Sequence, residues 1–444
     1  MGLDLMRRRT LIAAAGLAPL GAAAAPGDVF ANALSGASVA ADGGLPLAYF
    51  GTHFHRLVTP PEKTDAPTRW IEGTVGSLRL WDSDTRWADV APRAGVWKFE
   101  RLDAYVAQAE AHGARVLYTL GSTPRWASAR PDEPGPYGPG CAAEPVRLAH
   151  WEEYVGRVAA RYRGRIHAYE LWNEPHFSDY EIDRKHPGFF TGSMAQMMLL
   201  AQSARRVLDQ VDPAALLTTP GFVNGPHRLD LFLRSGGADV VQAVAYHFYA
   251  RDALQFAQQV ADVRSVMRQR GVTRLPLWNT ECGVETYADH EALPEGVTLR
   301  LTEADAAAKT AQFLLLGAAL RLDRFFYYAW DNYRSGMIDR QGRATPRFEA
   351  LRRSEQWLLG AQVTSVESVG VAGVRIDAAR GTERFALAWS ELDRPERIAL
   401  PAGWKIASCE SLRAGARPAW PLASGDATSV ALAPAPVCLR WARA

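Results

Sequence analysis

Eight short strand-like runs alternate with longer helical patterns between residues 47 and 331, and this alternation constrains the fold more than any other feature of the sequence. The runs are Leu47–His55, Ser77–Trp81, Arg115–Leu120, His167–Trp172, Leu216–Thr219, Val240–Tyr249, Pro276–Glu281 and Arg324–Trp330. Between them, apolar residues recur at helical spacing in Lys98–His112, Pro145–Tyr162, Gly192–Val211, Asp252–Arg270 and Thr302–Leu320. Strands that alternate with helices in this way predict parallel strands joined by helical crossovers.

The number of runs and the length of the segment favour a closed (β/α)₈ TIM barrel, which typically takes roughly 250 residues. An open doubly wound sheet has the same rhythm but is expected to carry a glycine-rich phosphate turn after its first strand. Residues 49–53, Tyr-Phe-Gly-Thr-His, are not such a turn. We therefore predict a catalytic-type barrel over residues 34–358.

The pattern changes from about residue 359, where short alternating runs are separated by Gly, Pro and Asp. These runs are Val371–Ile376, Arg384–Trp389, Arg397–Leu400, Ile406–Glu410, Ser429–Leu432 and Val437–Trp441. They predict a small β-sandwich accessory domain over residues 359–444. Cys409 and Cys438 fall in two of these runs, and the sequence is compatible with either a disulfide between them or two free thiols.

The N-terminus has the composition of an export signal. Arg7, Arg8 and Arg9 precede a mildly apolar, alanine-rich stretch, and residues 8–12 resemble a twin-arginine signal. Small residues at Ala31 and Ala33 predict cleavage near Ala33, which makes residues 1–33 the signal peptide and the mature protein periplasmic or secreted. No later run of eighteen apolar residues is present, so we expect no membrane anchor after cleavage.

Charge and cysteine content exclude several classes of function. Lys and Arg number 50 against 48 Asp and Glu, and no block of like charges suits a phosphate backbone, so we do not expect a nucleic-acid partner. The 4 cysteines include no C-x-x-C pair of a zinc site. No G-x-S-x-G sequence is present, which disfavours a Ser-His-Asp hydrolase.

Two acidic residues stand where a barrel places its chemistry, at the carboxyl ends of strands. Glu174 follows the fourth predicted strand and Glu281 ends the seventh, so their carboxyl groups are expected to face each other across the mouth of the barrel. A pair of carboxylates is the minimal apparatus for cleaving a glycosidic bond, because one must donate a proton while the other attacks or activates water. Glu285, four residues after Glu281, is the alternative second carboxylate.

The residues around this pair resemble a known family. Residues 172–175, Trp-Asn-Glu-Pro, together with Glu281 resemble the clan A glycoside hydrolases, and residues 123–128 resemble family 39 and its exopolysaccharide-hydrolase relatives. The resemblance implies that Glu174 is the acid/base and Glu281 the nucleophile of a retaining enzyme. It also implies that Asn173 binds the sugar 2-hydroxyl and that Arg79 keeps Glu281 ionised.

Other polar and aromatic residues at strand ends are candidates for substrate binding. Arg79 is a charge inside an apolar strand, which is costly unless the charge is paired. By the period of two, His53 and His55 share one side of the first strand, as His247 and Tyr249 share one side of the sixth. The histidines lack the spacing of a metal motif, so no metal site is predicted. Trp126 and Trp330 are possible sugar-stacking platforms, and for Trp330 this role follows from the resemblance.

Together these features predict an exported retaining glycoside hydrolase that needs no cofactor and whose partner is a carbohydrate. We favour endo-cleavage of a bacterial or plant-type polysaccharide, as in an exopolysaccharide hydrolase. The alternatives are an exo-acting β-xylosidase or arabinofuranosidase and a non-catalytic carbohydrate-binding barrel. The sequence does not indicate an oligomeric state, a sugar or a linkage.

Overall fold

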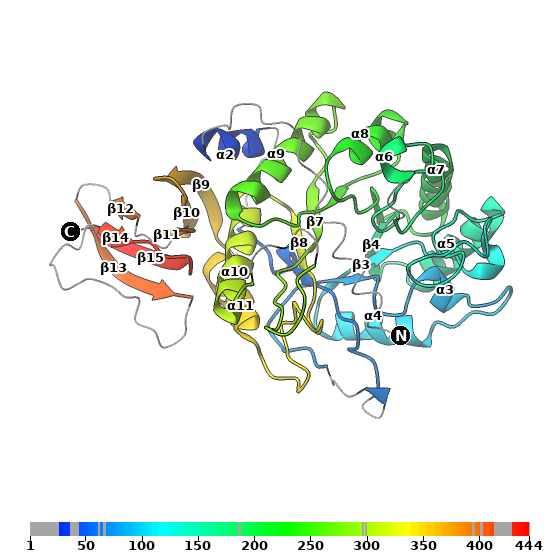
Figure 1. The fold of residues 1–444 in the computed structure, drawn as a ribbon, viewed down its shortest axis with the longest axis horizontal. Helices are drawn as coiled ribbons and strands as arrows, with labels where there is room; N and C mark the ends of the chain where they lie inside the picture. The colour runs from blue at the N-terminus through cyan, green and yellow to red at the C-terminus, as the bar shows by residue number, and fades with distance from the viewer. Residues whose placement is uncertain are drawn as a thin grey trace.

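In the computed structural model the chain forms a barrel and a smaller β domain, which lie side by side in Figure 1. The described residues are 26–35, 44–60, 63–64, 68–184, 188–294, 297, 300–392, 396–399, 403–412 and 429–443. The predicted twin-arginine motif lies outside them. None of the described helices combines the length and apolar character needed to cross a bilayer.

The core of the larger domain is an 8-stranded parallel sheet in the order β5-β4-β3-β2-β1-β8-β7-β6. Its strands are β1 (Phe50–Thr52), β2 (Ser77–Leu80), β3 (Arg115–Thr119), β4 (Ile166–Glu170), β5 (Leu216–Thr218), β6 (Val244–His247), β7 (Leu277–Cys282) and β8 (Arg324–Tyr327). A parallel bridge between Thr218 and Ala243 joins β5 to the chain leading into β6. The sheet therefore closes on itself, and the predicted TIM barrel is confirmed.

Helices cover the outside of the barrel. The long ones are α4 (Glu100–Ala111), α5 (Leu148–Arg161), α7 (Met194–Val211), α8 (His227–Arg234), α9 (Ala253–Gln269), α10 (Glu303–Ala319) and α11 (Pro346–Leu358). The start of α7 shows why these segments are helical: Ser193 caps the N–H of Gln196, and the Gln196 side chain bonds back to the N–H of Ser193. Met194, Met197 and Ala201 then belong to the apolar stripe that is buried against the barrel.

The elements differ from the sequence prediction at several boundaries. The expected strand from Leu47 starts only at Phe50, because Leu47–Tyr49 forms a 3₁₀ turn. The expected strand from Val240 starts at Val244, and the expected strand ending at Trp330 stops at Tyr327. Helices α8 and α11 were not among the predicted elements. The remaining barrel strands and helices lie within one to three residues of their predicted ends.

Apolar side chains fill the interior of the barrel below the carboxyl ends of its strands. Leu117, Ala168, Ala243, Trp278 and Phe326 form one buried cluster there. A Cβ atom on Gly51 would lie 2.6 Å from the Phe326 ring, so only glycine permits the close approach of β1 to β8. This packed floor restricts polar chemistry to the carboxyl ends of the strands.

The C-terminal domain is a β-sandwich, as predicted. Its main sheet has the order β13-β15-β11-β10-β9, and a second, 2-stranded sheet pairs β12 with β14. The strands are β9 (Gln362–Val369), which the sequence analysis missed, β10 (Gly373–Arg380), β11 (Glu383–Ser390), β12 (Arg397–Ala399), β13 (Trp404–Ser411), β14 (Ser429–Ala431) and β15 (Val437–Arg443). Apolar residues such as Ile398, Val430 and Leu439 form the cluster between the two sheets. The cysteines are free, so Cys409 and Cys438 are two thiols.

Helix α2 (Pro26–Leu34) packs against α9, beside which it lies in Figure 1. Val29, Phe30 and Ala33 are buried, and the guanidinium of Arg264 donates a hydrogen bond to the carbonyl oxygen of Ala33. The predicted cleavage site near Ala33 falls inside this helix. Cleavage there would remove α2 and leave the buried Arg264 without this acceptor.

Candidate active site

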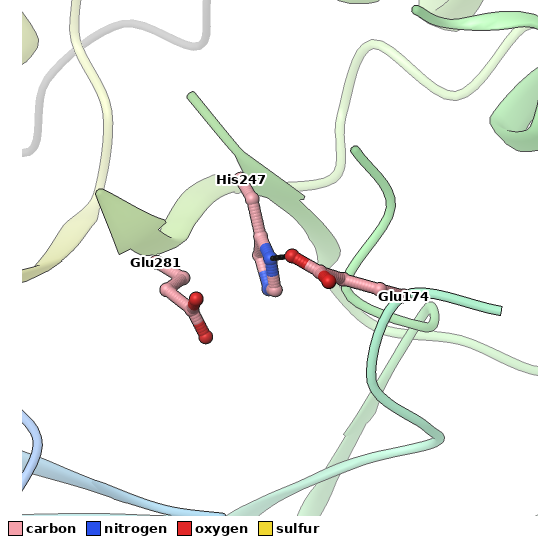
Figure 2. A group of neighbouring side chains, drawn as sticks. All are labelled: Glu174, His247 and Glu281. Carbon is pink, nitrogen blue, oxygen red and sulfur yellow. Dashed lines mark hydrogen bonds and ion pairs between the residues drawn. The ribbon is translucent and has the colours of Figure 1, made fainter. Parts of the chain in front are cut away.

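Glu174 and Glu281 converge at the carboxyl ends of β4 and β7. Figure 2 shows His247, from β6, between the two carboxyl groups. One ligand atom from each of the three residues lies within 4.8 Å of the others, and all three residues are buried. In retaining glycosidases the two carboxyl groups stand about 5–5.5 Å apart, whereas inverting enzymes need roughly 6.5–9.5 Å. The separation therefore fits retaining geometry.

The backbone of Glu174 is held in an unusual conformation. Its φ is +39°, in the left-handed region that residues other than glycine seldom adopt. Its N–H donates to the carbonyl oxygen of Gly221 at 3.0 Å, and its own carbonyl oxygen accepts from the N–H of Phe189 at 3.3 Å. Strain of this kind persists only where surrounding contacts over-determine the conformation, and it concentrates at functional sites.

Glu281 receives a hydrogen bond on each carboxylate oxygen. Arg79 donates from Nη1 to Oε2 at 2.9 Å, and the Tyr249 hydroxyl donates to Oε1 at 2.7 Å. Arg79 is fully buried on β2; burial lowers its pKa, but the Glu170 and Glu281 carboxylates raise it above its ordinary value. The guanidinium thus stays charged and favours the ionised form of Glu281.

The neighbours of Glu174 are of a different kind. Nδ1 of His247 lies 2.9 Å from Oε1 of Glu174, and both side chains are buried. Asn173 directs Oδ1 to Arg79 at 2.7 Å, while its Nδ2 has no partner among the described residues and can donate to a substrate hydroxyl. The structure thus brings Asn173 and His247 into the site together with the two carboxylates.

The site contains a third carboxylate that the sequence analysis did not single out. Glu170, fully buried on β4, accepts at Oε2 from Nε and Nη2 of Arg79 at 2.8 and 2.5 Å and from Thr119 at 2.7 Å. The signal was present in the sequence, because a carboxylate inside an apolar strand needs a partner for the same reason as Arg79 does.

His53 and His55 lie on the opposite side of the mouth from Glu174, at the end of β1. His53 contacts the backbone carbonyl of Thr280 through Nε2 at 3.1 Å, and burial holds its pKa well below the usual value, so its ring is neutral. Both rings pack against Tyr328, at centroid distances of 5.1 and 5.2 Å. Tyr328 donates its hydroxyl to Asp82 at 2.8 Å, and Tyr137, from the loop after β3, donates to the same carboxylate.

The two tryptophans occupy other places. Trp330 is fully buried: its ring packs with Phe54 and Phe348, and its Nε1 donates to the carbonyl oxygen of Arg69 at 3.0 Å. Trp126 donates to Ala91 at 2.8 Å and packs against His150, a residue of α5. The contacts of these rings are structural, and Tyr328 is the aromatic residue that lies beside His53 and His55.

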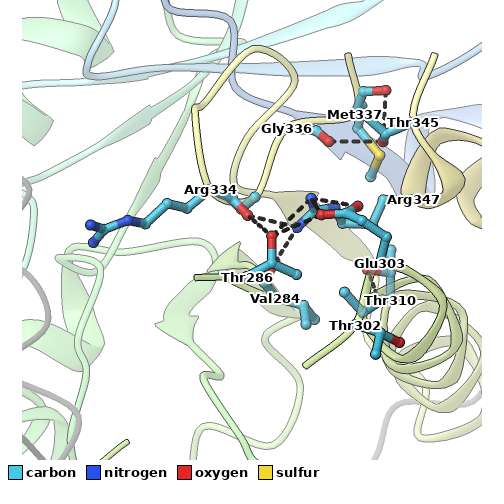
Figure 3. A network of polar contacts seen from close by, with 12 residues as sticks. Val284, Thr286, Thr302, Glu303, Thr310, Arg334, Gly336, Met337, Thr345 and Arg347 are labelled. Carbon is cyan, nitrogen blue, oxygen red and sulfur yellow. Dashed lines mark hydrogen bonds and ion pairs between the residues drawn. The ribbon is translucent and has the colours of Figure 1, made fainter. Parts of the chain in front are cut away.

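Glu285, the alternative second carboxylate, is exposed and accepts a hydrogen bond from Tyr287, away from Glu174. This leaves Glu281 as the partner of Glu174. The loop behind Glu281 is fixed by Arg347, a buried residue of α11 that donates to the carbonyl oxygens of Val284 and Arg334 at 3.0 and 2.7 Å. Figure 3 shows how the same guanidinium also reaches Glu303, 2.9 Å away, so that one side chain ties the loops after β7 and β8 to α10.

Glu174, His247 and Glu281 are close enough together to hold a cation. The same carboxylates differ in their partners, with a guanidinium on Glu281 and an imidazole on Glu174. A cation site needs no such difference, whereas an acid and a nucleophile do. We therefore interpret the group as an acid–base pair, and the absence of a metal stays a prediction.

Comparison with known proteins supports the fold. No protein-family model and no curated protein sequence matches the chain. A family 39 glycoside hydrolase from Bacteroides cellulosilyticus WH2 superimposes with a TM-score of 0.65 and 17% identity, covering 89% of this chain and 81% of that one. A glucosidase from Croceicoccus marinus gives a TM-score of 0.59 and 16% identity, covering 92% and 98% of the two chains.

A family 30 subfamily 8 xylanase, Xyn30A from Clostridium acetobutylicum, gives a TM-score of 0.55 and 13% identity, with 83% of this chain and 89% of that one covered. The matched share of this chain is larger than the barrel alone in each of the three comparisons. The chain therefore has the fold of these three glycoside hydrolase structures, a TIM barrel with a C-terminal β-sandwich.

Proposed function

We propose that this protein is a retaining glycoside hydrolase. The observation that carries the proposal is the pair of buried carboxyl groups at the mouth of the barrel, with oxygens within 4.8 Å of each other and with different partners. Arg79 and Tyr249 favour an ionised Glu281. His247 gives Glu174 a partner that can accept a hydrogen bond from a protonated carboxyl group.

In the first half of the reaction, Glu281 attacks the anomeric carbon while Glu174 donates its proton to the leaving oxygen. A covalent glycosyl–enzyme intermediate forms between the sugar and Glu281. In the second half, the ionised Glu174 takes a proton from water, which displaces Glu281 and leaves the product with the starting anomeric configuration. Asn173 is placed beside Arg79 to donate to the sugar 2-hydroxyl.

The substrate that the sequence favours is the interior of a polysaccharide, but one contact supports the exo-acting alternative. The leaving group lies on the side of Glu174, so the rest of the sugar extends toward β8, β1 and β2. There, Tyr137 and Tyr328 both donate to Asp82, and these two hydrogen bonds link the end of β8 to the loop after β3. We infer that this link limits the site on that side, as the exo-acting alternative requires.

The experiment is a panel of aryl glycosides and bacterial and plant polysaccharides, with proton NMR of the first-formed sugar. Retained configuration supports the proposal, and an inverted product overturns the nucleophilic role of Glu281. If Glu281→Ala still binds oligosaccharides and the wild type turns over no substrate, the non-catalytic binding barrel is the better interpretation. On a polysaccharide, a rapid fall in viscosity indicates endo-cleavage, and release of single sugars without that fall indicates exo-cleavage.

A further inference from the structure

The interior of the barrel holds one carboxylate oxygen that the mechanism above does not use. Oε2 of Glu170 accepts from three donor atoms, two on Arg79 and one on Thr119. The other oxygen, Oε1, is buried and has no hydrogen-bond partner among the described residues. A buried carboxylate oxygen without a donor is costly, so its surroundings need an explanation.

Oε1 of Glu170 shares its surroundings with a second unpartnered atom, Nε2 of His247. A Cβ atom on Gly221 would lie 2.9 Å from Oε1 and 2.4 Å from Nε2, and the three heavy atoms nearest to that point belong to these two residues alone. Nε2 also lacks a hydrogen-bond partner within the described part of the chain. Because residue 221 is a glycine, no side chain separates the two atoms.

The two nitrogens of His247 therefore face two different carboxyl groups, with Nδ1 2.9 Å from Oε1 of Glu174 and Nε2 on the side of Glu170. A carboxylate only accepts hydrogen bonds, so Glu170 favours a proton on Nε2. In a neutral imidazole, a proton on Nε2 makes Nδ1 an acceptor. The only hydrogen bond then possible between Nδ1 and Glu174 is one that a protonated Glu174 donates.

We propose that Glu170 is a positioning residue that fixes the tautomer of His247 and thereby keeps Glu174 in the protonated form that the first half of the reaction needs. The inference rests on the proposed function, since it assigns the acid to Glu174.

Charged and titratable groups from the surrounding elements also face this cluster. They are Arg79 on β2, His53 after β1, Tyr249 after β6 and Glu281 on β7. Arg79 and Tyr249 bond to Glu281, and Nε2 of His53 bonds to a backbone carbonyl oxygen. None of these four residues contributes one of the three atoms nearest to a Cβ at Gly221, so Glu170 is the group placed to set the proton of Nε2.

The test is Glu170→Gln. This change keeps the shape of the side chain but replaces the acceptor oxygen that faces Nε2 of His247 with a donor NH₂ group. The three donors of Arg79 and Thr119 require an acceptor, so the amide oxygen takes the place of Oε2 and the NH₂ group takes the place of Oε1. The NH₂ group donates to Nε2 of His247, the proton moves to Nδ1, and Nδ1 then donates to Glu174. Glu174 then accepts this hydrogen bond instead of donating it.

The first readout is ¹⁵N NMR of histidine-labelled protein near pH 7, with the His247 signals assigned by their loss in His247→Asn. We expect an Nε2–H tautomer in the wild type and an Nδ1–H tautomer in Glu170→Gln. Thr119→Val, which alters only the Oε2 side of Glu170, serves as the control and should keep the wild-type tautomer. An Nδ1–H or a doubly protonated ring in the wild type overturns the proposal, even if the glutamine variant fails to fold.

The second readout is the pH dependence of kcat/KM. For a substrate with a poor leaving group, the alkaline limb should move to lower pH in Glu170→Gln and activity at pH 8 should fall at least tenfold. For a substrate whose leaving group needs no proton, the alkaline limb of the kcat/KM profile should be at the same pH in Glu170→Gln as in the wild type. Equal losses on both substrates would show that Glu170 acts only through Arg79 and overturn the proposal. If no substrate is turned over while the tautomers are as expected, the proposed function fails and the tautomer assignment stands.

Discussion

Nη1 of Arg79 donates to Oε2 of Glu281 at 2.9 Å, although 202 residues separate the two in the sequence. The same guanidinium donates through Nε and Nη2 to Glu170 and through Nη2 to Asn173. Both ions of the Arg79–Glu281 pair are buried, with side-chain exposures of 0% and 3%. A buried ion pair of this kind contributes little net stability, and its main effect here is to fix the charge and orientation of Glu281, the proposed nucleophile.

Arg79→Lys tests this role. Lysine keeps the positive charge but lacks the planar fork that serves several acceptors at once. We expect the free energy of unfolding to fall by about 1–3 kcal/mol, because at least one buried acceptor loses its donor. The acidic limb of the kcat/KM profile should move to higher pH, since Glu281 is less strongly held in its ionised form. Arg115→Lys, at an exposed position on β3, is the control; an unchanged acidic limb in Arg79→Lys would contradict the assignment.

The roles of Glu174 and Glu281 should be distinguishable from how each variant acts on substrates with different leaving groups. Glu174→Gln removes acid/base catalysis, which contributes about 10²–10⁴-fold, so alkyl glycosides should lose that factor while aryl glycosides with acidic phenols keep their rate of glycosylation. Glu281→Ala should abolish turnover of both. Pre-steady-state measurement of phenol release distinguishes the variants, and equal losses in Glu174→Gln for both classes of substrate would argue against its role as the acid.

Asp82 should act on substrate binding. It accepts from Tyr328 and Tyr137, which come from opposite sides of the β2 strand end. Asp82→Asn weakens at least one of these bonds, and we expect KM for an aryl glycoside to rise about tenfold, equivalent to one hydrogen bond, with kcat changed less than about twofold. Asp132→Asn, on the exposed part of the same β3 loop, is the control. A fall in kcat that matches the rise in KM would place Asp82 in the chemical step instead.

The position of most site residues could be predicted from the sequence because the active site of a TIM barrel lies at the carboxyl ends of its strands. Glu174, Glu281, His247 and Tyr249 stand at or just after strand ends, and the period of two along a strand determines which of them point inward. Arg79 was predicted from the cost of an unpaired charge in an apolar strand. These inferences need only local sequence and the barrel geometry.

The exceptions depend on where strands end, which local sequence fixes poorly. The sequence predicts that β8 runs to Trp330, but the strand ends at Tyr327. Tyr328 therefore takes the strand-end position beside the histidines, and Trp330 falls in the loop, where Phe54 and Phe348 bury it. Glu170 was not predicted, although it is a charge in an apolar strand, because Glu174 stands nearer the carboxyl end of β4, where a barrel places its chemistry.

The export signal remains a prediction, and the packing of α2 adds a condition to it. Changing Arg8 and Arg9 together to Lys should retain the protein in the cytoplasm if the signal is of the twin-arginine type. Because Val29, Phe30 and Ala33 are buried against the barrel, we expect the exported chain to keep α2. The intact mass of the periplasmic protein locates the cleavage. A mature chain that begins after Ala33 and unfolds at the same temperature as the longer chain would show that α2 is dispensable.

Stability should depend on pH through Glu355, a buried carboxyl group of α11 that accepts the N–H of Val75 at 2.9 Å. Burial raises the pKa of Glu355 from 4.5 to about 7, against the opposing effect of that hydrogen bond. Between about pH 4.5 and 7 the unfolded chain releases this proton while the folded protein retains it, so the free energy of unfolding falls as the pH rises through this range.

Glu355→Gln should remove this pH dependence, since glutamine can accept the same hydrogen bond without ionising. Relative to the wild type, the variant should gain up to about 3 kcal/mol in unfolding free energy between pH 4 and pH 8, the equivalent of the raised pKa. Urea denaturation at both pH values measures the difference, and Glu349→Gln on the same helix is the control, because that carboxylate is half-exposed and paired with Arg352. A difference that is the same at both pH values would show that Glu355 ionises as easily in the folded protein as in the unfolded chain.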